Sequence, residues 1–147
     1  MTNAIPGTDY VGLACGVFLF NEKGQFLMML RSKNTRADHG RWGIPGGLVE
    51  LNETVEEAIK REAKEETGVD LAVFQPIGYV DHILHAEGKH FVSQIFVATE
   101  YSGVPVNMEP GKFDRFEWFS VDELPENTSD VVHGAVRHYV EWTKKGK

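Results

Sequence analysis

Cysteine is nearly absent from the chain, and so are basic runs and long apolar segments. Cys15 is the only cysteine among 147 residues, which excludes an intramolecular disulfide and a cysteine zinc cluster. It stands in an apolar run and is expected to be a small core residue. No apolar run approaches the length that spans a bilayer, and residues 1–10 lack the basic and apolar regions of a secretory signal. These absences predict a cytoplasmic protein with no membrane partner.

The charge balance of the chain is acidic. It has 15 Lys and Arg against 22 Asp and Glu, for a formal net charge of −7. Tight binding to long nucleic acid depends on basic clusters that neutralise phosphates, and no such cluster is present. A small anionic nucleotide can still bind where metal ions bridge the like charges. The length predicts one domain, residues 1–147, with a core of its own.

Apolar runs separated by turn signals outline the secondary structure. Residues 12–20 and 25–30 are apolar on either side of a turn at 21–24, which predicts a hairpin with both strands largely buried. A second hairpin is predicted from 77–84 and 90–99. Strands and helices alternate, so the predicted fold class is α/β (α+β) around a mixed sheet. The remaining predicted elements are a short strand at 113–119 and a closing amphipathic helix at 131–143.

The segment 47–69 carries the strongest pattern in the sequence. Thr54 and Glu57 fit a capping box that begins a helix, and Gly68 is a suitable residue to end it. Between them, apolar residues recur at three- and four-residue steps, so one face of the helix is apolar. The residues of this face are Val55, Ala58, Ile59 and Ala63.

Two glutamates fall on that apolar face. At roughly 100° per residue, Glu62 and Glu66 lie on either side of the direction of Val55, each within about 20° of it. Buried ionised carboxylates are costly unless they are paired or bound to a metal. Carboxylate oxygens one turn apart suit a hard divalent cation such as Mg²⁺ or Mn²⁺. The pattern therefore predicts a metal site.

An ordinary solvated helix is the alternative interpretation. Arg61 has i,i+4 partners in Glu57 and Glu65, as exposed helices commonly do. This alternative accounts for the other charged residues of the helix, but it leaves Glu62 and Glu66 on the apolar side unexplained.

The spacing over 47–69 resembles the signature of the Nudix hydrolases. The pattern is G-x5-E-x7-R-E-U-x-E-E-x-G-U, where U is an aliphatic-type residue, and the chain fills it without a gap. The resemblance implies the Nudix α/β/α sandwich over nearly the whole chain. It also implies cleavage of phosphoanhydride bonds in nucleoside diphosphates linked to a further group. The matching residues are Gly47, Glu53, Arg61, Glu62, Ala63, Glu65, Glu66, Gly68 and Val69.

The resemblance further implies roles for individual residues. Glu62 and Glu66 would hold a Mg²⁺ or Mn²⁺ ion together with the backbone carbonyl of Gly46. Glu65 would bind a second ion or act as the general base, and Arg61 would orient the carboxylates. With a structural partner in Glu53, the catalytic set is Glu53, Arg61, Glu62, Glu65 and Glu66, and the metal set is Gly46, Glu62, Glu65, Glu66 and Glu109.

Outside residues 47–69, the sequence patterns that indicate function are less specific. Residues 106–125 are similar to the tail of the MutT-like nucleoside triphosphate pyrophosphohydrolases, in which an acidic loop residue adds a metal ligand or the base. Glu109 is the first candidate for that role and Asp114 the second, and an exposed loop acid is the alternative. The predicted substrate-binding residues are Arg31 for the phosphates and Phe113 and His133 for the base, with surface or core positions as the alternative.

The histidines disfavour two other chemistries. His82, His85 and His90 cluster around the second predicted hairpin, but their spacing fits no standard zinc site. The related mannosyl hydrolases of nucleotide sugars attack the sugar carbon with the help of a late-loop histidine. No histidine lies between Gly103 and Trp118, which favours attack at phosphorus.

The predicted function is Mg²⁺-dependent hydrolysis of a nucleoside or deoxynucleoside triphosphate to the monophosphate and pyrophosphate. Such catalysis needs charge neutralisation and an in-line water. The alternatives are hydrolysis of a nucleotide sugar, such as GDP-mannose, or of ADP-ribose, and a non-catalytic nucleotide-sensing module. The intact glutamates Glu62, Glu65 and Glu66 count against the sensor. The predicted partner is a small nucleotide, and a homodimer is left open.

Overall fold

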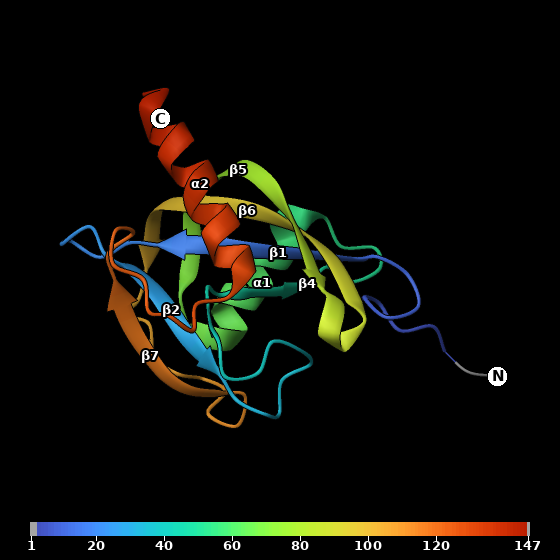
Figure 1. The fold of residues 1–147 in the computed structure, drawn as a ribbon. Coiled ribbons are helices and arrows are strands. Elements are labelled where there is room, and N and C mark those ends of the chain that lie inside the picture. The colour runs from blue at the N-terminus through green and yellow to red at the C-terminus, as the bar shows by residue number, and fades with distance from the viewer. Residues whose placement is uncertain (1–2, 147) are drawn as a thin grey trace.

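A four-stranded mixed sheet lies at the centre of the computed structural model, which describes residues 3–146. In it β1 (Gly12–Leu19) runs parallel to β6 (Lys89–Ser102). The flanking strands β4 (Gly46–Leu48) and β5 (Asp70–Leu84) are antiparallel to their neighbours, in the order β4-β1-β6-β5 (Figure 1). The predicted mixed sheet is confirmed.

A second sheet has three antiparallel strands in the order β3-β2-β7. They are β3 (Trp42–Gly43), β2 (Phe26–Arg31) and β7 (Phe113–Phe119), and β7 coincides with the predicted strand. Apolar side chains of β2 join both hydrophobic cores of the protein, so the second sheet closes one end of the first.

The prediction that residues 12–20 and 25–30 pair as a hairpin is wrong. The strands β1 and β2 belong to different sheets, and within residues 3–146 an isolated bridge between Phe20 and Phe26 is the only pairing of the two segments. Strand β1 already pairs with β4 and β6 on its two edges. Because both runs are apolar on both faces, their pattern does not specify a partner.

The second predicted hairpin is confirmed and is longer than the sequence indicated. Strands β5 and β6 pair from Asp70 opposite Ser102 to Leu84 opposite Lys89, and a short 3-10 turn at His85–Glu87 joins them. This long ribbon carries residues from the mixed sheet to the rim of the cavity described below.

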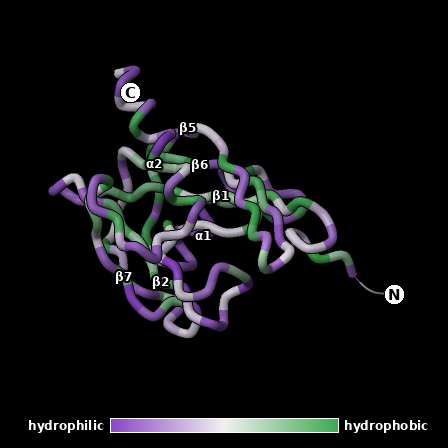
Figure 2. Tube along the Cα trace, viewed as in Figure 1, coloured by the Kyte–Doolittle hydropathy of each residue, from purple (hydrophilic) through white to green (hydrophobic). Residues whose placement is uncertain are grey.

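Two helices cover opposite faces of the mixed sheet. Side chains alternate along β1, so Val17 and Leu19 pack with α1 (Val55–Thr67) while Phe18 packs with α2 (Asp130–Lys144). Figure 1 shows α2 in front of the sheet and α1 behind it. Figure 2 shows the apolar residues gathered in the central strands and the hydrophilic residues in the outer loops. This is the α/β/α sandwich that the Nudix resemblance implied.

The ends of the helices follow the predicted signals. The Thr54 hydroxyl accepts from the Glu57 N–H at 3.0 Å, and the Glu57 carboxylate accepts from the Thr54 N–H at 3.0 Å, which completes the capping box. Gly68 ends α1 with a φ of 77°, a conformation that favours glycine. Helix α2 extends the predicted range by one residue at each end. Over residues 3–146, neither helix is both long and apolar enough to span a membrane.

Gly134 in α2 provides a test of the packing between this helix and the sheet. Alanine normally favours a helix over glycine by about 1 kcal/mol, but a Cβ at this position would lie 2.7 Å from Val80 Cγ1. Overpacking costs about 1–3 kcal/mol, so we expect Gly134→Ala to lower the free energy of unfolding, measured by urea denaturation. Gly111→Ala is the control, because its Cβ would meet nothing within 4 Å. A stabilised Gly134→Ala protein would contradict this packing.

Candidate active site

The Arg61 guanidinium is the centre of a hydrogen-bond cluster on α1. It binds both carboxylate oxygens of Glu53, at 2.7 and 3.0 Å. It also donates to Glu62 at 2.8 Å, to Glu65 at 2.9 Å and to the carbonyl of Leu48 at 3.0 Å. A planar guanidinium can make these bonds at once because its five donors are fixed in a fork. One side chain thus joins α1 to the preceding loop and to β4.

The charges of this cluster are mutually stabilised. Hydrogen bonds from the Arg61 side chain, and then from the Glu50 N–H, lower the pKa of Glu53 to about 2. In turn Glu53, and then Glu62 and Glu65, hold the pKa of Arg61 above its ordinary value. Arg61 and Glu53 are therefore both ionised at neutral pH. Within this cluster, Glu53 fixes the guanidinium rather than facing the other carboxylates.

Glu66 is a buried carboxylate on the next turn of α1. Its side chain is 5% exposed, and it accepts a hydrogen bond of 2.8 Å from the Gly46 N–H. Burial, and then repulsion from Glu62, raises the pKa of Glu66 well above its ordinary value. Gly46 can make this bond because β4 runs very close to β1: a Cβ on Gly46 would lie 2.0 Å from the Cys15 carbonyl oxygen.

Gly47 leaves the space that Glu62 occupies. A Cβ on Gly47 would lie 2.6 Å from the carboxylate carbon of Glu62, so the carboxylate rests against bare backbone. Burial raises the pKa of Glu62, although the hydrogen bond from Arg61 opposes this shift. The first glycine of the 47–69 pattern and its second glutamate, Glu62, are thus linked by direct contact.

The loop that follows β6 brings Glu109 toward these carboxylates. The Met108 N–H donates to the carbonyl of Glu66 at 3.1 Å, and the Val106 N–H donates to that of Thr67 at 3.0 Å. The negative charge of Glu109 contributes to the raised pKa of both Glu62 and Glu66. Asp114, the second candidate, is exposed on β7. The structure therefore places Glu109 with the carboxylates of α1.

The donor chemistry of this group fits a divalent cation. Glu62, Glu66 and Glu109 gather negative charge that burial makes unfavourable, and carboxylate and carbonyl oxygens are the ligands of Mg²⁺. Among residues 3–146, no three His, Cys, Asp or Glu side chains already converge as a cation site. The carboxylates of Glu62 and Glu65 both contact the guanidinium of Arg61 instead.

A cavity of about 150 Å³ adjoins the carboxylates on the far side of β4. Small residues of β1, Ala14 and Gly16, form part of its wall. Arg31 also lines it and donates from Nε to the Ala37 carbonyl at 2.8 Å. Burial lowers the pKa of Arg31, and the charge of Glu66 opposes that shift. The Arg31 side chain thus lines the cavity and is also within electrostatic range of the Glu66 carboxylate.

Two predicted base-binding residues lie elsewhere. Phe113 is 2% exposed and packs edge-on against Phe116, because β7 belongs to the second sheet. His133 is exposed in the first turn of α2. Neither side chain lines the cavity.

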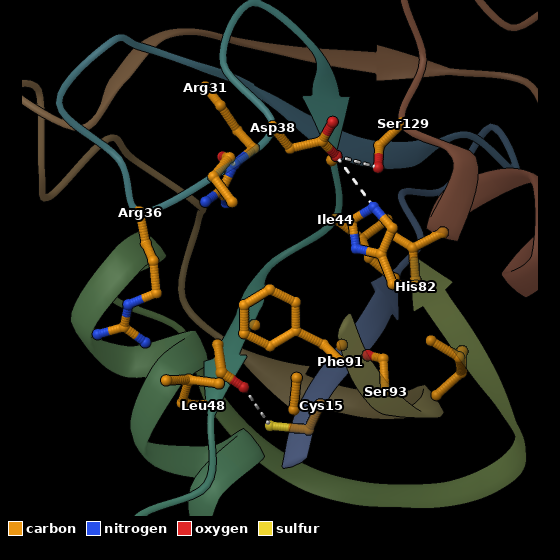
Figure 3. Close-up of a pocket in the computed structure, with 18 residues that line it drawn as sticks. Cys15, Arg31, Arg36, Asp38, Ile44, Leu48, His82, Phe91, Ser93 and Ser129 are labelled. Atoms are coloured by element: carbon orange, nitrogen blue, oxygen red, sulfur yellow. Dashed lines mark hydrogen bonds and ion pairs between the residues drawn. The ribbon is translucent and has the colours of Figure 1, made fainter. Parts of the chain in front are cut away.

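Three polar residues at the cavity had not been assigned together from the sequence: Asp38, His82 and Ser129. Asp38 comes from the loop between β2 and β3, His82 from β5 and Ser129 from the residue before α2. Figure 3 shows the three side chains meeting at one wall of the cavity. In the sequence, His82 stands out only as one of three clustered histidines, and no spacing indicates this group, since its members are far apart in the chain.

Known proteins resemble this chain over most of its length. The profile of the NUDIX domain matches residues 11–140. The MutT NUDIX hydrolase from Burkholderia pseudomallei, a solved structure, is 33% identical with a TM-score of 0.79, over 86% of this chain and 96% of that one. The chain therefore belongs to the Nudix family.

Two relatives carry more particular names. The 8-oxo-dGDP phosphatase NUDT18 of Danio rerio is 38% identical over 120 residues, which are 80% of this chain and 35% of that protein. The ADP-ribose pyrophosphatase of Methanocaldococcus jannaschii is 31% identical over 121 residues, which are 82% of this chain and 69% of that protein. The chain thus spans about a third of the length of the first relative.

Replacing Glu66 by glutamine is expected to stabilise the metal-free protein. The pKa of Glu66 is higher in the folded state than the ordinary 4.5, so ionisation weakens folding at pH 7 and the penalty disappears below the unfolded pKa. In EDTA, Glu66→Gln should therefore melt at a higher temperature than the wild type at pH 7, with a smaller difference near pH 5. The exposed neighbour Glu56→Gln is the control. A lower melting temperature for Glu66→Gln would refute the electrostatic cost assigned to this carboxylate.

Proposed function

We propose that the protein hydrolyses a phosphoanhydride bond of a nucleoside or deoxynucleoside triphosphate with Mg²⁺ or Mn²⁺, giving the monophosphate and pyrophosphate. The observation that carries the proposal is the buried carboxylate of Glu66, with Glu62 and Glu109 close enough to raise its pKa. Such a concentration of like charge destabilises the fold unless a cation binds there. Membership of the Nudix family supports the same chemistry.

The proposed cation would be held by Glu62, Glu66 and the Gly46 carbonyl, with Glu65 or Glu109 as a further ligand. When bound, it would neutralise the charge of the anhydride and lower the pKa of a water molecule. The remaining one of these two glutamates is then available as the general base.

The residues around the cation have separate tasks in this proposal. Arg61 holds the side chains of Glu62 and Glu65 until they turn to the cation, and Glu53 keeps the guanidinium in place. The Gly46 N–H fixes the orientation of the Glu66 carboxylate. Arg31, which lines the cavity and feels the charge of Glu66, would balance phosphate charge. Positioning of this kind is the main protein contribution to phosphoryl transfer.

ADP-ribose is the second candidate substrate, because one relative bears the name ADP-ribose pyrophosphatase. A panel of triphosphates, nucleotide sugars and ADP-ribose, with separate detection of phosphate, pyrophosphate and AMP, distinguishes the two. Pyrophosphate from a triphosphate supports the proposal. Release of AMP from ADP-ribose alone favours the second candidate, and metal-dependent stabilisation without any hydrolysis favours a nucleotide sensor.

Removal of one carboxylate charge tests the proposed cation site. We expect Glu66→Gln to lower kcat by about 100-fold or more on the best triphosphate, because charge stabilisation in the transition state is lost. The matched control Glu56→Gln lies on the exposed side of the same helix and should keep the wild-type kcat. Circular dichroism checks that both variants are folded. Wild-type turnover by Glu66→Gln would rule out this site.

The position of bond cleavage is a separate test. Hydrolysis in H₂¹⁸O should place the label in a phosphate-containing product, because attack at phosphorus breaks the anhydride bond there. Mass spectrometry of the products measures this directly. Label in a free sugar released from a nucleotide sugar would instead establish attack at carbon.

A further inference from the structure

His82 is held at the cavity wall by a carboxylate. Its Nε2 lies 3.4 Å from Oδ2 of Asp38, and the two side chains are only 12% and 10% exposed. The Ser129 hydroxyl donates to the same oxygen of Asp38. Nε2 of His82 is buried and makes no hydrogen bond within residues 3–146, so its contact with Asp38 is a charged approach at ion-pair distance. Asp38 is therefore the group toward which this ring nitrogen is directed.

The pairing determines which nitrogen of the neutral imidazole carries the proton. Burial tends to raise the pKa of Asp38, but the contacts from His82 and Ser129 outweigh burial and hold it below its ordinary value. An ionised carboxylate can only accept, so its position next to Nε2 favours the neutral tautomer with the proton on Nε2 and the lone pair on Nδ1. Figure 3 shows this second ring nitrogen pointing into the cavity, toward Phe91 and away from Asp38. The cavity wall thus presents an oriented acceptor.

Phe91 lies beside this acceptor, because it is the cross-strand partner of His82 in the β5–β6 pair, and it also lines the cavity (Figure 3). Its ring is 7% exposed and fills space that side chains at two neighbouring glycines would occupy. A Cβ on Gly7 would lie 2.3 Å from the ring and one on Gly12 would lie 2.8 Å from it. The ring is therefore confined to one position. A cavity of about 150 Å³ is large enough to take one ring of a planar heterocycle.

These observations identify the kind of ligand that fits. A planar heterocycle can lie against Phe91 while an N–H at its edge donates to His82 Nδ1. A ligand with a lone pair at that edge would face the lone pair of Nδ1 and leave both groups unpaired.

We propose that the Asp38–His82 pair makes this cavity select a nucleobase that presents an N–H donor at the edge facing His82. The inference rests on the proposed function, because it takes the heterocycle to be the base of the nucleotide substrate. Within it, His82 touches the base and determines specificity, whereas Asp38 and Ser129 are positioning residues that act through the imidazole.

Three pairs of nucleotides test the proposal, since one member of each pair has an N–H donor at a position where the other has none: ITP and 1-methyl-ITP at N1, ATP and purine riboside triphosphate at the 6-amino group, and 8-oxo-dGTP and dGTP at N7. In at least one pair, the wild type should bind the N–H member about tenfold more tightly or better. Dissociation constants are measured by calorimetry with the α,β-imido analogues, so that binding is assessed apart from turnover.

His82→Phe keeps a ring of similar size and removes the acceptor. It should reduce the preference for the N–H member to within about twofold, while binding of the other member stays close to that of the wild type. The control His90→Phe changes the neighbouring Asp–His pair, in which Nε2 lies 3.2 Å from Asp81 and the side chain is 38% exposed. His90→Phe should keep the wild-type preference. No preference in any pair, or a preference that survives in His82→Phe, would overturn the proposal.

Nitrogen-15 NMR of the wild-type protein provides a test that does not depend on the variant folding. At pH 8 the His82 ring should show a protonated Nε2 and an unprotonated Nδ1, and the Nδ1 resonance should move when the preferred imido analogue is added. A proton on Nδ1 would overturn the assignment. Selective binding without hydrolysis of any triphosphate would refute the proposed function but not the assignment of His82 as the group that selects the base. Hydrolysis of a triphosphate without such selectivity would support the proposed function and overturn the assignment of His82.

Discussion

The binding of one guanidinium by several carboxylates is the interaction on which the rest of the site depends. Arg61 reaches Glu53 in the loop before α1, Glu62 and Glu65 on the helix itself, and the backbone of Leu48 in β4. Without the positive charge of the Arg61 guanidinium, the carboxylates of Glu53, Glu62 and Glu65 would repel one another. With it, a loop, a strand and a helix are held in register, and the carboxylates remain beside the cavity.

Close approach of backbone to carboxylate is the second constraint. Glu66 and Glu62 both rest against β4, at Gly46 and Gly47, and neither glycine has room for a Cβ. These two glycines therefore do not act as flexible turn residues. They allow β4 to lie against β1 on one side and against carboxyl groups of α1 on the other. A buried carboxylate is tolerated here because a backbone N–H of Gly46 satisfies part of its hydrogen bonding.

Local signals predicted more of this structure than long-range ones did. The limits of α1 follow from contacts within a few residues, namely the Thr54–Glu57 capping box and the left-handed Gly68. Helical periodicity likewise placed Glu62 and Glu66 toward the interior. The partner of β1 could not be predicted, because an apolar run is compatible with several neighbours and the strands that pair with β1 are remote in sequence. The group of Asp38, His82 and Ser129 was missed for the same reason, since three separate elements must fold before its members meet.

The loop that carries Glu109 is also the C-terminal cap of the helix that carries Glu66. Its N–H groups at Val106 and Met108 bind the carbonyls of Thr67 and Glu66, which the helix itself leaves without partners. Opening this loop would therefore leave the last carbonyls of α1 without partners. The Gly111 carbonyl of the same loop accepts hydrogen bonds from Ser32 and Asn34, which belong to the segment that carries Asp38. A change in the length of this loop would consequently alter both the helix end beside Glu66 and the segment that lines the cavity.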